Sequence, residues 1–323
     1  MHFSCLRRRV CLGWRGRGLT TVSGLVCHVL LYALLFVLVL SLSCGLVGLL
    51  LMPQQPPHPS PSKGLWLERT ASGVQVLGTH DSPDYRLFLA AGGQGQEQGP
   101  RLSFWHDLFL RAPKSPTARV PLFNFLCEIP RGSRAKMEVK LQEPFNPIAQ
   151  DLTKEGELRF FRYGDVPFNY GCLPQTWENP ELLTEETGSK GDGDPLDVVE
   201  IGPDPILSGR VHAVKVLGIL GMIDSGETDW KVIAISRQDP DLFHALHNIE
   251  DVDTHLPGKL DSIRDWFRYY KVAEGKSESQ FAFQGKFQDQ EYAMRIIEET
   301  HQQWKELALD KNHPQRGHYW FPK

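Results

Sequence analysis

Short strand-like segments and a hairpin dominate the middle of the chain. Residues 157–162, 211–223 and 231–235 are rich in the β-branched and aromatic side chains that are typical of β-strands. Residues 224–229 lie between the last two segments and consist mainly of turn-forming residues. The pattern therefore predicts a β-hairpin with residues 224–229 at its tip.

Toward the C-terminal end, the apolar positions change to helical spacing. Two groups of apolar side chains recur there with the period of an amphipathic helix, which predicts two helices. The groups are Leu260, Ile263, Phe267 and Tyr270, and Tyr292, Ile296, Trp304 and Leu307. Strands followed by helices indicate an α+β fold that is mainly β, with a closed or half-closed barrel and helices packed outside it.

A long apolar run near the start, residues 25–52, carries only His28 as an ionisable group. It exceeds the ~20 residues that a helix needs to cross a bilayer, and five arginines precede it. We interpret it as an N-terminal apolar helix that spans a membrane, with the N-terminus on the cytosolic side. An organelle-import sequence or an artefact of the assigned start codon is the alternative, because import signals are also basic and poor in acidic residues.

The rest of the chain divides by composition. Residues 53–63 contain five prolines and are expected to form an extended spacer. We therefore expect a basic and apolar head at 1–52, a proline-rich linker at 53–72, a folded domain at 73–310 and a tail at 311–323. The folded domain is expected in the cytoplasm or an organelle matrix, anchored to a membrane or imported through the head.

Composition and charge exclude several classes of protein. The 323 residues are 41% hydrophobic, which excludes a disordered or collagen-like chain. The first 67 residues hold six basic residues and no acidic one, so the remainder carries a net charge of −10. Such an acidic body favours bound cations over a nucleic-acid partner. Only Cys127 and Cys172 lie in this body, which excludes a disulfide framework and a cysteine zinc site.

The densest chemistry is a loop in which Asp192, Asp194 and Asp197 stand within six residues. Two unit charges ~4 Å apart repel by ~1 kcal/mol in water and by ~4 kcal/mol at an effective dielectric near 20. Such a cluster either takes up protons or shares cations, and its oxygen-only donors favour Mg²⁺, with Mn²⁺ as a substitute. A solvated acidic loop is the alternative. Asp224 and Asp229 of the predicted hairpin add two more carboxylates.

Basic and aromatic residues suited to holding phosphate lie on either side of these acids. They are Lys136, Arg159, Tyr170, Lys231, Tyr270 and Lys271. Each of them alone would more often be a surface charge or a half-buried ring. Their spacing therefore leaves a phosphate site and a set of simple ion pairs equally open.

Taken together, these segments resemble the soluble inorganic pyrophosphatases of the eukaryotic type (family I). The family signature D-x-D-P-x-D-[V/L] appears at residues 192–198. Further family blocks appear in order at residues 128–138, 143–148, 169–178, 224–231, 266–271 and 280–283. The resemblance covers residues 120 to 309.

The resemblance implies a five-stranded OB-like β-barrel with flanking α-helices, and hydrolysis of pyrophosphate to two phosphates with Mg²⁺. It implies a metal site made of Asp192, Asp194, Asp197, Asp224, Asp229, Glu128 and Glu138, with Asp194 also beside the attacking water. It implies that the substrate is held by Lys136, Arg159, Tyr170, Tyr270, Lys271 and Lys231. The catalytic residues are predicted to be Asp194, Arg159, Tyr170 and Lys136. A homodimer is expected.

Two positions depart from the family pattern. Val166 stands four residues before Tyr170, where many relatives carry another tyrosine, and the sequence leaves open whether Tyr163 compensates. Ser225 replaces an acid that is common beside Asp224. We expect activity to survive both changes, with effects on the rate or on metal affinity.

Two other functions compete with hydrolysis. A basic head, an apolar span, a proline-rich stem and a D-x-D motif also describe a Golgi-type glycosyltransferase, in which Asp192 and Asp194 would hold Mn²⁺ and a nucleotide sugar. The absence of any Asn-x-Ser/Thr acceptor and the two cysteines of the body argue against a lumenal domain. The other alternative is a membrane-tethered, non-catalytic metal or phosphate binder of the same fold.

Overall fold

The computed structural model describes residues 73–91, 99–113 and 120–323. The predicted apolar helix and membrane span at 25–52, and the proline-rich linker at 53–72, lie outside the described residues. Within the described ranges, no helix has both the length and the apolar character needed to cross a bilayer.

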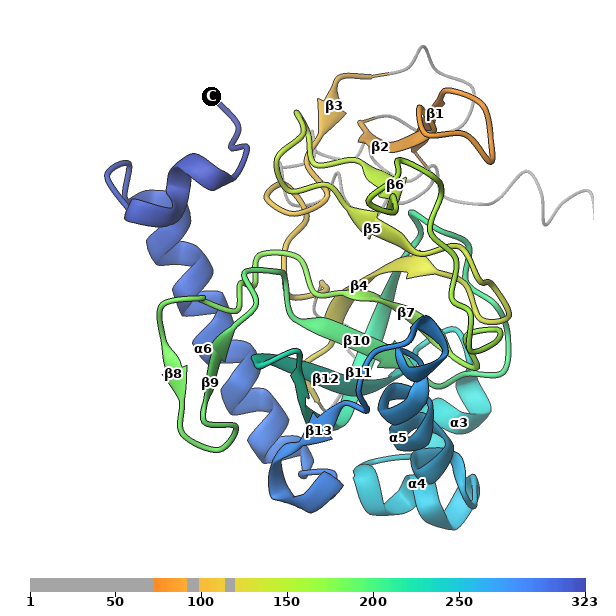
Figure 1. Cartoon of the computed structure of the whole chain (residues 1–323). Coiled ribbons are helices and arrows are strands. Elements are labelled where there is room, and N and C mark those ends of the chain that lie inside the picture. Colours follow the sequence, from red (N-terminus) through yellow and green to blue (C-terminus); the bar gives the residue numbers. More distant parts are fainter. Residues whose placement is uncertain (1–72, 92–98, 114–119) are drawn as a thin grey trace, which may run out of the picture. The chain divides into compact units, whose positions relative to one another are not determined.

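Five strands of the larger sheet pair with one another in a closed series (Figure 1). They are β4 (Phe123–Ile129), β7 (Asn169–Cys172), β10 (Asp197–Glu200), β11 (Val211–Asp224) and β12 (Glu227–Ser236). Hydrogen bonds join β11 to β4, β4 to β7, β7 to β10, β10 to β12, and β12 back to β11. The β10–β12 pair is parallel and the other four pairs are antiparallel. Most side chains of these strands are buried on both faces, so the strands form the centre of the domain.

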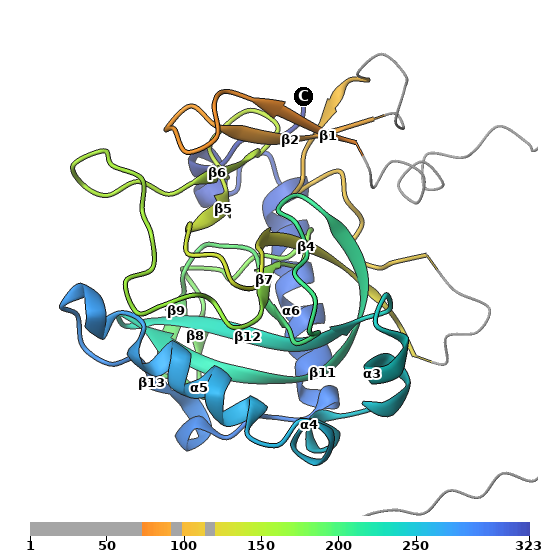
Figure 2. The same ribbon diagram turned by 90° about the vertical axis from the view of Figure 1, so that its right-hand side faces the viewer.

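The remaining strands are short. The larger sheet is extended by β8 (Leu183–Thr184), β9 (Ser189–Gly191) and β13 (Gln280–Phe281). A second sheet consists of β1 (Val74–Leu77), β2 (Arg86–Ala90), β3 (Arg101–Leu102), β5 (Met137–Val139) and β6 (Ile148–Gln150). In Figure 2 this second sheet lies above β4, and its strand β5 lines the pocket described below.

The helices pack outside the strands, as the sequence predicts (Figures 1 and 2). They are α3 (Pro240–Ala245), α4 (Ile249–His255), α5 (Lys259–Tyr269) and α6 (Gln290–Leu309), with 3₁₀ turns η2 (Val272–Glu274), η3 (Ala282–Gly285) and η4 (Pro314–His318). Leu260 and Ile263 bury the inner face of α5, and Ile296 and Leu307 bury that of α6, so both predicted helices are confirmed. The mainly β architecture with flanking helices is confirmed as well.

The predicted hairpin is confirmed, but its turn is shorter than expected. Strand β11 continues to Asp224 and β12 begins at Glu227, so only Ser225 and Gly226 form the turn. Both have positive φ, 56° and 92°, as a two-residue turn between right-twisted strands requires. Asp229 therefore does not lie at the tip: it faces Met222 within the ladder and is only 6% exposed.

The predicted strand at 157–162 is wrong as a regular strand. Leu158 bridges Leu152, and Phe160 bridges Ala135, each as a single isolated pair. The segment runs between residues 134–136 and residues 151–153 and makes backbone hydrogen bonds to both, but it forms only one bridge with each, so no continuous ladder forms. Its extended backbone nevertheless presents Arg159 to the same pocket as β5.

Candidate active site

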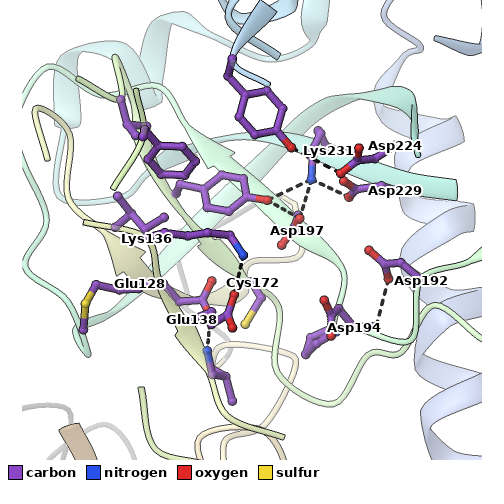
Figure 3. A pocket seen from close by; sticks show the side chains of 18 of the residues that line it. Glu128, Lys136, Glu138, Cys172, Asp192, Asp194, Asp197, Asp224, Asp229 and Lys231 are labelled. Carbon is purple, nitrogen blue, oxygen red and sulfur yellow. Dashed lines mark hydrogen bonds and ion pairs between the residues drawn. The ribbon is translucent and has the colours of Figure 1, made fainter. Parts of the chain in front are cut away.

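A pocket of about 320 Å³ opens between β5, the loop before β10, the β11–β12 hairpin and the end of α5 (Figure 3). All thirteen residues that the sequence nominates for the site line this one pocket. They are Glu128, Lys136, Glu138, Arg159, Tyr170, Asp192, Asp194, Asp197, Asp224, Asp229, Lys231, Tyr270 and Lys271. The 192–197 loop and the 224–229 hairpin thus face the same space, while the role of each residue stays a prediction.

The loop before β10 directs its carboxylates into the pocket. Gly193 has a φ of 86°, a conformation that glycine adopts without strain. The N–H of Asp194 donates to Oδ1 of Asp192 at 2.9 Å, which fixes that carboxylate. The side chain of Asp194 is exposed to the pocket, and Asp197 follows as the first residue of β10. Three acids therefore converge within one tight bend (Figure 3).

A buried lysine lies behind these acids. Asp197 and Lys231 are partners in the parallel β10–β12 register, which places their side chains together. The ammonium group of Lys231 donates to Oδ2 of Asp197 and Oδ1 of Asp229, both at 2.5 Å, and to Oη of Tyr170 at 2.9 Å. Burial favours the neutral amine, but the two carboxylates outweigh it and raise the pKa of Lys231. The lysine is thus charged and uses all three of its hydrogens on pocket groups.

Asp224 has its own set of partners at the edge of the hairpin. Lys271 donates to its carboxylate, Tyr270 Oη donates to Oδ2 at 3.3 Å, and Ser225 Oγ donates to Oδ1 at 3.1 Å. Burial opposes ionisation, but the hydrogen bond and charge of Lys271 lower the pKa of Asp224. This carboxylate is therefore ionised and held beside the α5 end.

The other pocket acids are far less well compensated. Burial, together with the charges of neighbouring carboxylates, raises the pKa values of Glu128 and Asp192 well above their ordinary range. Desolvation by the surrounding protein and the charges of neighbouring carboxylates also raise the pKa values of Asp194 and Asp229 to about 7, although Asp194 is open to the pocket and Lys231 acts in the opposite direction on both. The protein alone therefore does not neutralise the negative charge that it gathers here.

Two of the pocket acids form a carboxylate triad with Glu178, which does not line the pocket, and this triad fits a divalent cation. Oxygen atoms of Glu178, Asp192 and Asp229 all lie within 4.8 Å of one another. Oε1 of Glu178 accepts a hydrogen bond from the N–H of Trp230 at 3.1 Å, whereas its buried Oε2 has no partner in the described part of the chain. An all-oxygen donor set with an unsatisfied buried acceptor suits a hard cation such as Mg²⁺.

The opposite wall of the pocket is basic. Lys136 pairs with Glu138 at 2.7 Å and with Asp151 at 3.1 Å, and Arg159 pairs with Asp151 at 3.0 Å and with Glu274 at 3.1 Å. Burial opposes ionisation of Asp151, but Lys136 and Arg159 lower its pKa to about 2. Asp151 thus holds two cationic side chains close together, which is a suitable arrangement for a multiply charged anion.

Sequence reasoning missed two members of this arrangement. Glu178 ends one of the family blocks, but its burial and its proximity to Asp192 arise only from the fold. Asp151 lies outside the quoted blocks, and its link between Lys136 and Arg159 joins segments that no local pattern connects. The sequence signal for Glu178 is its place at the end of a family block, whereas Asp151 has only its position near Arg159.

The structure also places the two departures from the family pattern. Val166 is 1% exposed and lines the pocket, so an apolar side chain occupies that part of the wall. Tyr163 is 44% exposed and does not line the pocket, so it does not replace a tyrosine at position 166. Ser225 contacts Asp224 and lies 3.4 Å from Nζ of Lys271, where it adds a hydroxyl instead of a charge.

Stabilisation by Mg²⁺ is expected to grow with pH. The pKa values of Asp194 and Asp229 rise from 3.8 in the reference state to about 7 in the fold, so the folded protein binds more protons between these values. Without metal, their contribution to stability is present below about pH 4 and is lost as the pH rises through about 7. A cation bound to these carboxylates would compete with the protons, so we expect Mg²⁺ to raise the unfolding temperature more at about pH 7.5 than at about pH 5.5.

Thermal unfolding with Mg²⁺ and with EDTA at both pH values measures this difference. Buried His106, whose pKa is lowered to about 4 mainly by desolvation, has the opposite pH dependence. Its contribution cancels because it is the same with and without metal. An equal metal-induced shift at both pH values would contradict the carboxylate site.

Comparisons with known proteins agree with this geometry. The family model described as "Inorganic pyrophosphatase" matches residues 125–305. The inorganic pyrophosphatase of Zygosaccharomyces bailii is 45% identical over 239 residues, which are 72% of this chain and 79% of that protein. The soluble inorganic pyrophosphatase 6, chloroplastic, of Arabidopsis thaliana is 46% identical over 236 residues, or 73% and 74% of the two chains.

A solved structure shows the same fold. The N-terminally truncated vacuolar soluble pyrophosphatase of Trypanosoma cruzi, described as a complex with PPi, superposes with a TM-score of 0.69 at 43% identity, covering 73% of this chain and 91% of that chain. The sequence blocks, the fold and the pocket therefore lead to one assignment. The chain belongs to the inorganic pyrophosphatases of family I, eukaryotic type.

Proposed function

We propose that this protein hydrolyses inorganic pyrophosphate to two phosphates in a multi-metal, Mg²⁺-dependent site. The observation that carries the proposal is a single pocket with undercompensated carboxylates on one wall and Lys136 and Arg159 on the other. Pyrophosphate is a compact, multiply charged anion that needs both cations and hydrogen-bond donors. The description of the T. cruzi relative as a complex with PPi supports this substrate.

Carboxylates from several segments of the chain would hold the metal ions. Asp192, Asp197, Asp224 and Asp229 line the pocket and would be metal ligands, with Asp194 beside the attacking water. Glu128 and Glu138 would support the site. Glu178 does not line the pocket, but its carboxylate lies close enough to Asp192 and Asp229 to share an ion with them. When bound, divalent cations lower the pKa of a water molecule and neutralise charge on the phosphates. Mg²⁺ suits these oxygen donors, and Mn²⁺ is the expected substitute.

The protein's own groups would position and protonate the reactants. Asp194 faces the pocket and would accept the proton of the attacking water, because its carboxylate is exposed there. Lys136 and Arg159 would neutralise charge that develops on the leaving phosphate. Burial raises the pKa of Tyr170 and of Tyr270, so both hydroxyls keep their hydrogens. They donate to Asp197 and Asp224 in this structure and would turn to phosphate oxygens once cations occupy those carboxylates.

Two lysines need their partners rearranged to reach phosphate. Lys271 is paired with Asp224, and Lys231 is fully used by Asp197, Asp229 and Tyr170. Cations on these carboxylates would weaken their hold on the lysines. We propose that Lys271 then turns to phosphate, and that Lys231 chiefly balances the charge of the metal ligands from within the pocket.

The closed series of pairings supports the finer fold assignment. Because β11, β4, β7, β10 and β12 return to the starting strand, we infer that they form the five-stranded OB-like barrel that the family resemblance implies. The pocket opens on the side of this series where β10 begins and the β11–β12 hairpin ends.

A phosphate-release assay on the full chain tests the activity. With Mg²⁺ and pyrophosphate we expect steady release of phosphate that EDTA abolishes, and no release of nucleotide from a UDP-sugar. Binding of Mn²⁺ without turnover of pyrophosphate would select a non-catalytic binder of the same fold. Turnover of the UDP-sugar alone would select a glycosyltransferase.

The role of residues 1–52 and the oligomeric state of the protein are also matters of proposal. We propose that the head, through residues 25–52, either anchors the protein to a membrane or directs it into an organelle, and that the enzyme is a homodimer. The chloroplastic relative is an organellar precedent for the second route. Fluorescent tags at each end of the chain, with fractionation, separate anchoring from cleavage and import.

A further inference from the structure

The C-terminal tail packs against the back of the metal-ligand loop. It follows α6 and lies beyond residue 305, where the family match ends. The N–H of Trp320 donates to the carbonyl of Leu141 at 2.8 Å, and the carbonyl of Trp320 lies 3.0 Å from Nε2 of His106. Nδ1 of His106 accepts from Nε1 of Trp304 at 3.1 Å, so Nε2 carries the hydrogen and donates to Trp320. Backbone and ring contacts thus fix the tail in one position.

The position of the tail brings the hydroxyl of Tyr319 to Gly193, which lies between Asp192 and Asp194. Tyr319 Oη donates to the carbonyl of Gly193 at 3.0 Å and accepts from Nε1 of buried Trp177 at 3.1 Å. Nε1 of Trp177 also lies 3.1 Å from the same carbonyl. Burial raises the pKa of Tyr319, so the hydroxyl keeps its hydrogen. Tyr319 does not line the pocket and acts from behind the loop.

The carbonyl that Tyr319 holds belongs to the peptide that positions Asp192. The carbonyl of Gly193 and the N–H of Asp194 are parts of one planar peptide unit and point in opposite directions. That N–H donates to Oδ1 of Asp192 at 2.9 Å. A hydrogen bond that holds the Gly193 carbonyl therefore also holds the N–H of Asp194 in the orientation in which it donates to Asp192.

Two backbone hydrogen bonds also hold this loop: the N–H of Gly193 donates to the carbonyl of Glu178, and the N–H of Glu178 donates to the carbonyl of Asp194, both at 2.9 Å. The peptide unit between Gly193 and Asp194 is itself held through its carbonyl, by Tyr319 and Trp177. Gly193 has positive φ, and glycine gives the adjoining peptide freedom to rotate. A rotated peptide would remove the hydrogen bond to Asp192 and turn a carbonyl oxygen toward negative groups. A Cβ on Gly193 would lie 2.9 Å from Tyr319 Oη, so the same close approach also excludes a larger residue.

We propose that Tyr319 is a positioning residue that locks the Gly193–Asp194 peptide and thereby presets the Asp192 carboxylate for metal binding. The inference rests on the proposed function, because it treats Asp192 as a metal ligand. The tail would then contribute to metal binding, although none of its side chains lines the pocket.

The test is direct Mn²⁺ binding to full-length Tyr319→Phe, measured by calorimetry without substrate. The variant keeps the ring between Trp105 and Trp177 and loses only the hydroxyl. Loss of one hydrogen bond predicts Mn²⁺ binding weaker by about three- to tenfold. The Mg²⁺ concentration for half-maximal hydrolysis should rise by the same factor, while kcat at saturating Mg²⁺ stays within about twofold of wild type.

Tyr292→Phe is the matched control, because it removes a tyrosine hydroxyl that bonds Glu186 at 2.7 Å outside the active-site pocket. It should leave metal binding unchanged. Unchanged Mn²⁺ affinity in Tyr319→Phe, with or without a lower unfolding temperature, would overturn the inference. So would a loss of kcat at saturating metal without a change in affinity. Failure of the proposed function is distinct, since wild type itself would then release no phosphate from pyrophosphate, whether or not it binds Mn²⁺.

Discussion

Replacing Asp194 with asparagine is expected to lower the turnover of pyrophosphate by ~10²- to 10⁴-fold. The amide has nearly the same shape as the carboxylate but cannot accept the proton of the attacking water. Metal binding should weaken much less, because Asp192, Asp197 and Asp229 remain. Steady-state phosphate release at saturating Mg²⁺, together with calorimetric Mn²⁺ binding, measures the two effects separately.

Asp253→Asn is the matched control for this substitution. Asp253 is an exposed carboxylate on α4, outside the pocket, so its amide variant should hydrolyse pyrophosphate at the wild-type rate. A near-normal rate in Asp194→Asn would show that another group takes the proton. A loss of rate that excess Mg²⁺ restores would instead make Asp194 chiefly a metal ligand.

Replacing Lys231 with methionine is expected to reduce the stability of the metal-free protein by about 3–5 kcal/mol. The lysine side chain is 2% exposed, and those of its partners Asp197 and Asp229 are 18% and 8% exposed. Removing the ammonium leaves these acids without their shared positive partner in a region that water reaches poorly. Urea unfolding in EDTA at neutral pH measures the loss.

Lys215→Met is the control for burial of a lysine as such. Lys215 is 4% exposed, but its ammonium donates to the carbonyl of Phe243, and desolvation lowers its pKa. Its removal breaks no ion pair with a pocket acid, so the loss of stability should be smaller. Mg²⁺ should restore part of the stability of the Lys231 variant, because cations take over the lost charge. Equal losses in both variants would contradict the role of Lys231 as a compensating charge.

The regular parts of the fold follow from local patterns in the sequence. Alternating and β-branched residues predict β11 and β12, and helical spacing predicts α5 and α6, because each pattern repeats over several turns or pairs. The short turn at Ser225 and Gly226 was not predicted, since Glu227 and Thr228 are ordinary loop residues until the ladder extends through them. Residues 157–162 have strand-forming side chains but lack a continuous partner strand.

The candidate site likewise contains residues that the sequence predicts and residues that only the folded structure identifies. Its acids and basic residues could be named from family blocks, except Arg159, which lies in the strand-like segment 157–162, and the fold brings all of them to one pocket. Glu178, Asp151 and Tyr319 could not be named, because each acts through contacts between distant segments: Glu178 with Asp229, Asp151 with Lys136, and Tyr319 with Gly193. Burial and such contacts are properties of the assembled chain, which spacing does not encode.

Asp197 and Lys231 are partners across β10 and β12, so the charge balance of the site depends on the correct register of these two strands. A displacement of one residue would turn the lysine to the opposite face of its strand, because side chains alternate with a period of two. Such a misaligned molecule could remain compact and well hydrogen bonded, yet its acids would face one another without their counter-charge. Catalytic competence would therefore report correct assembly of the β structure more sensitively than compactness does.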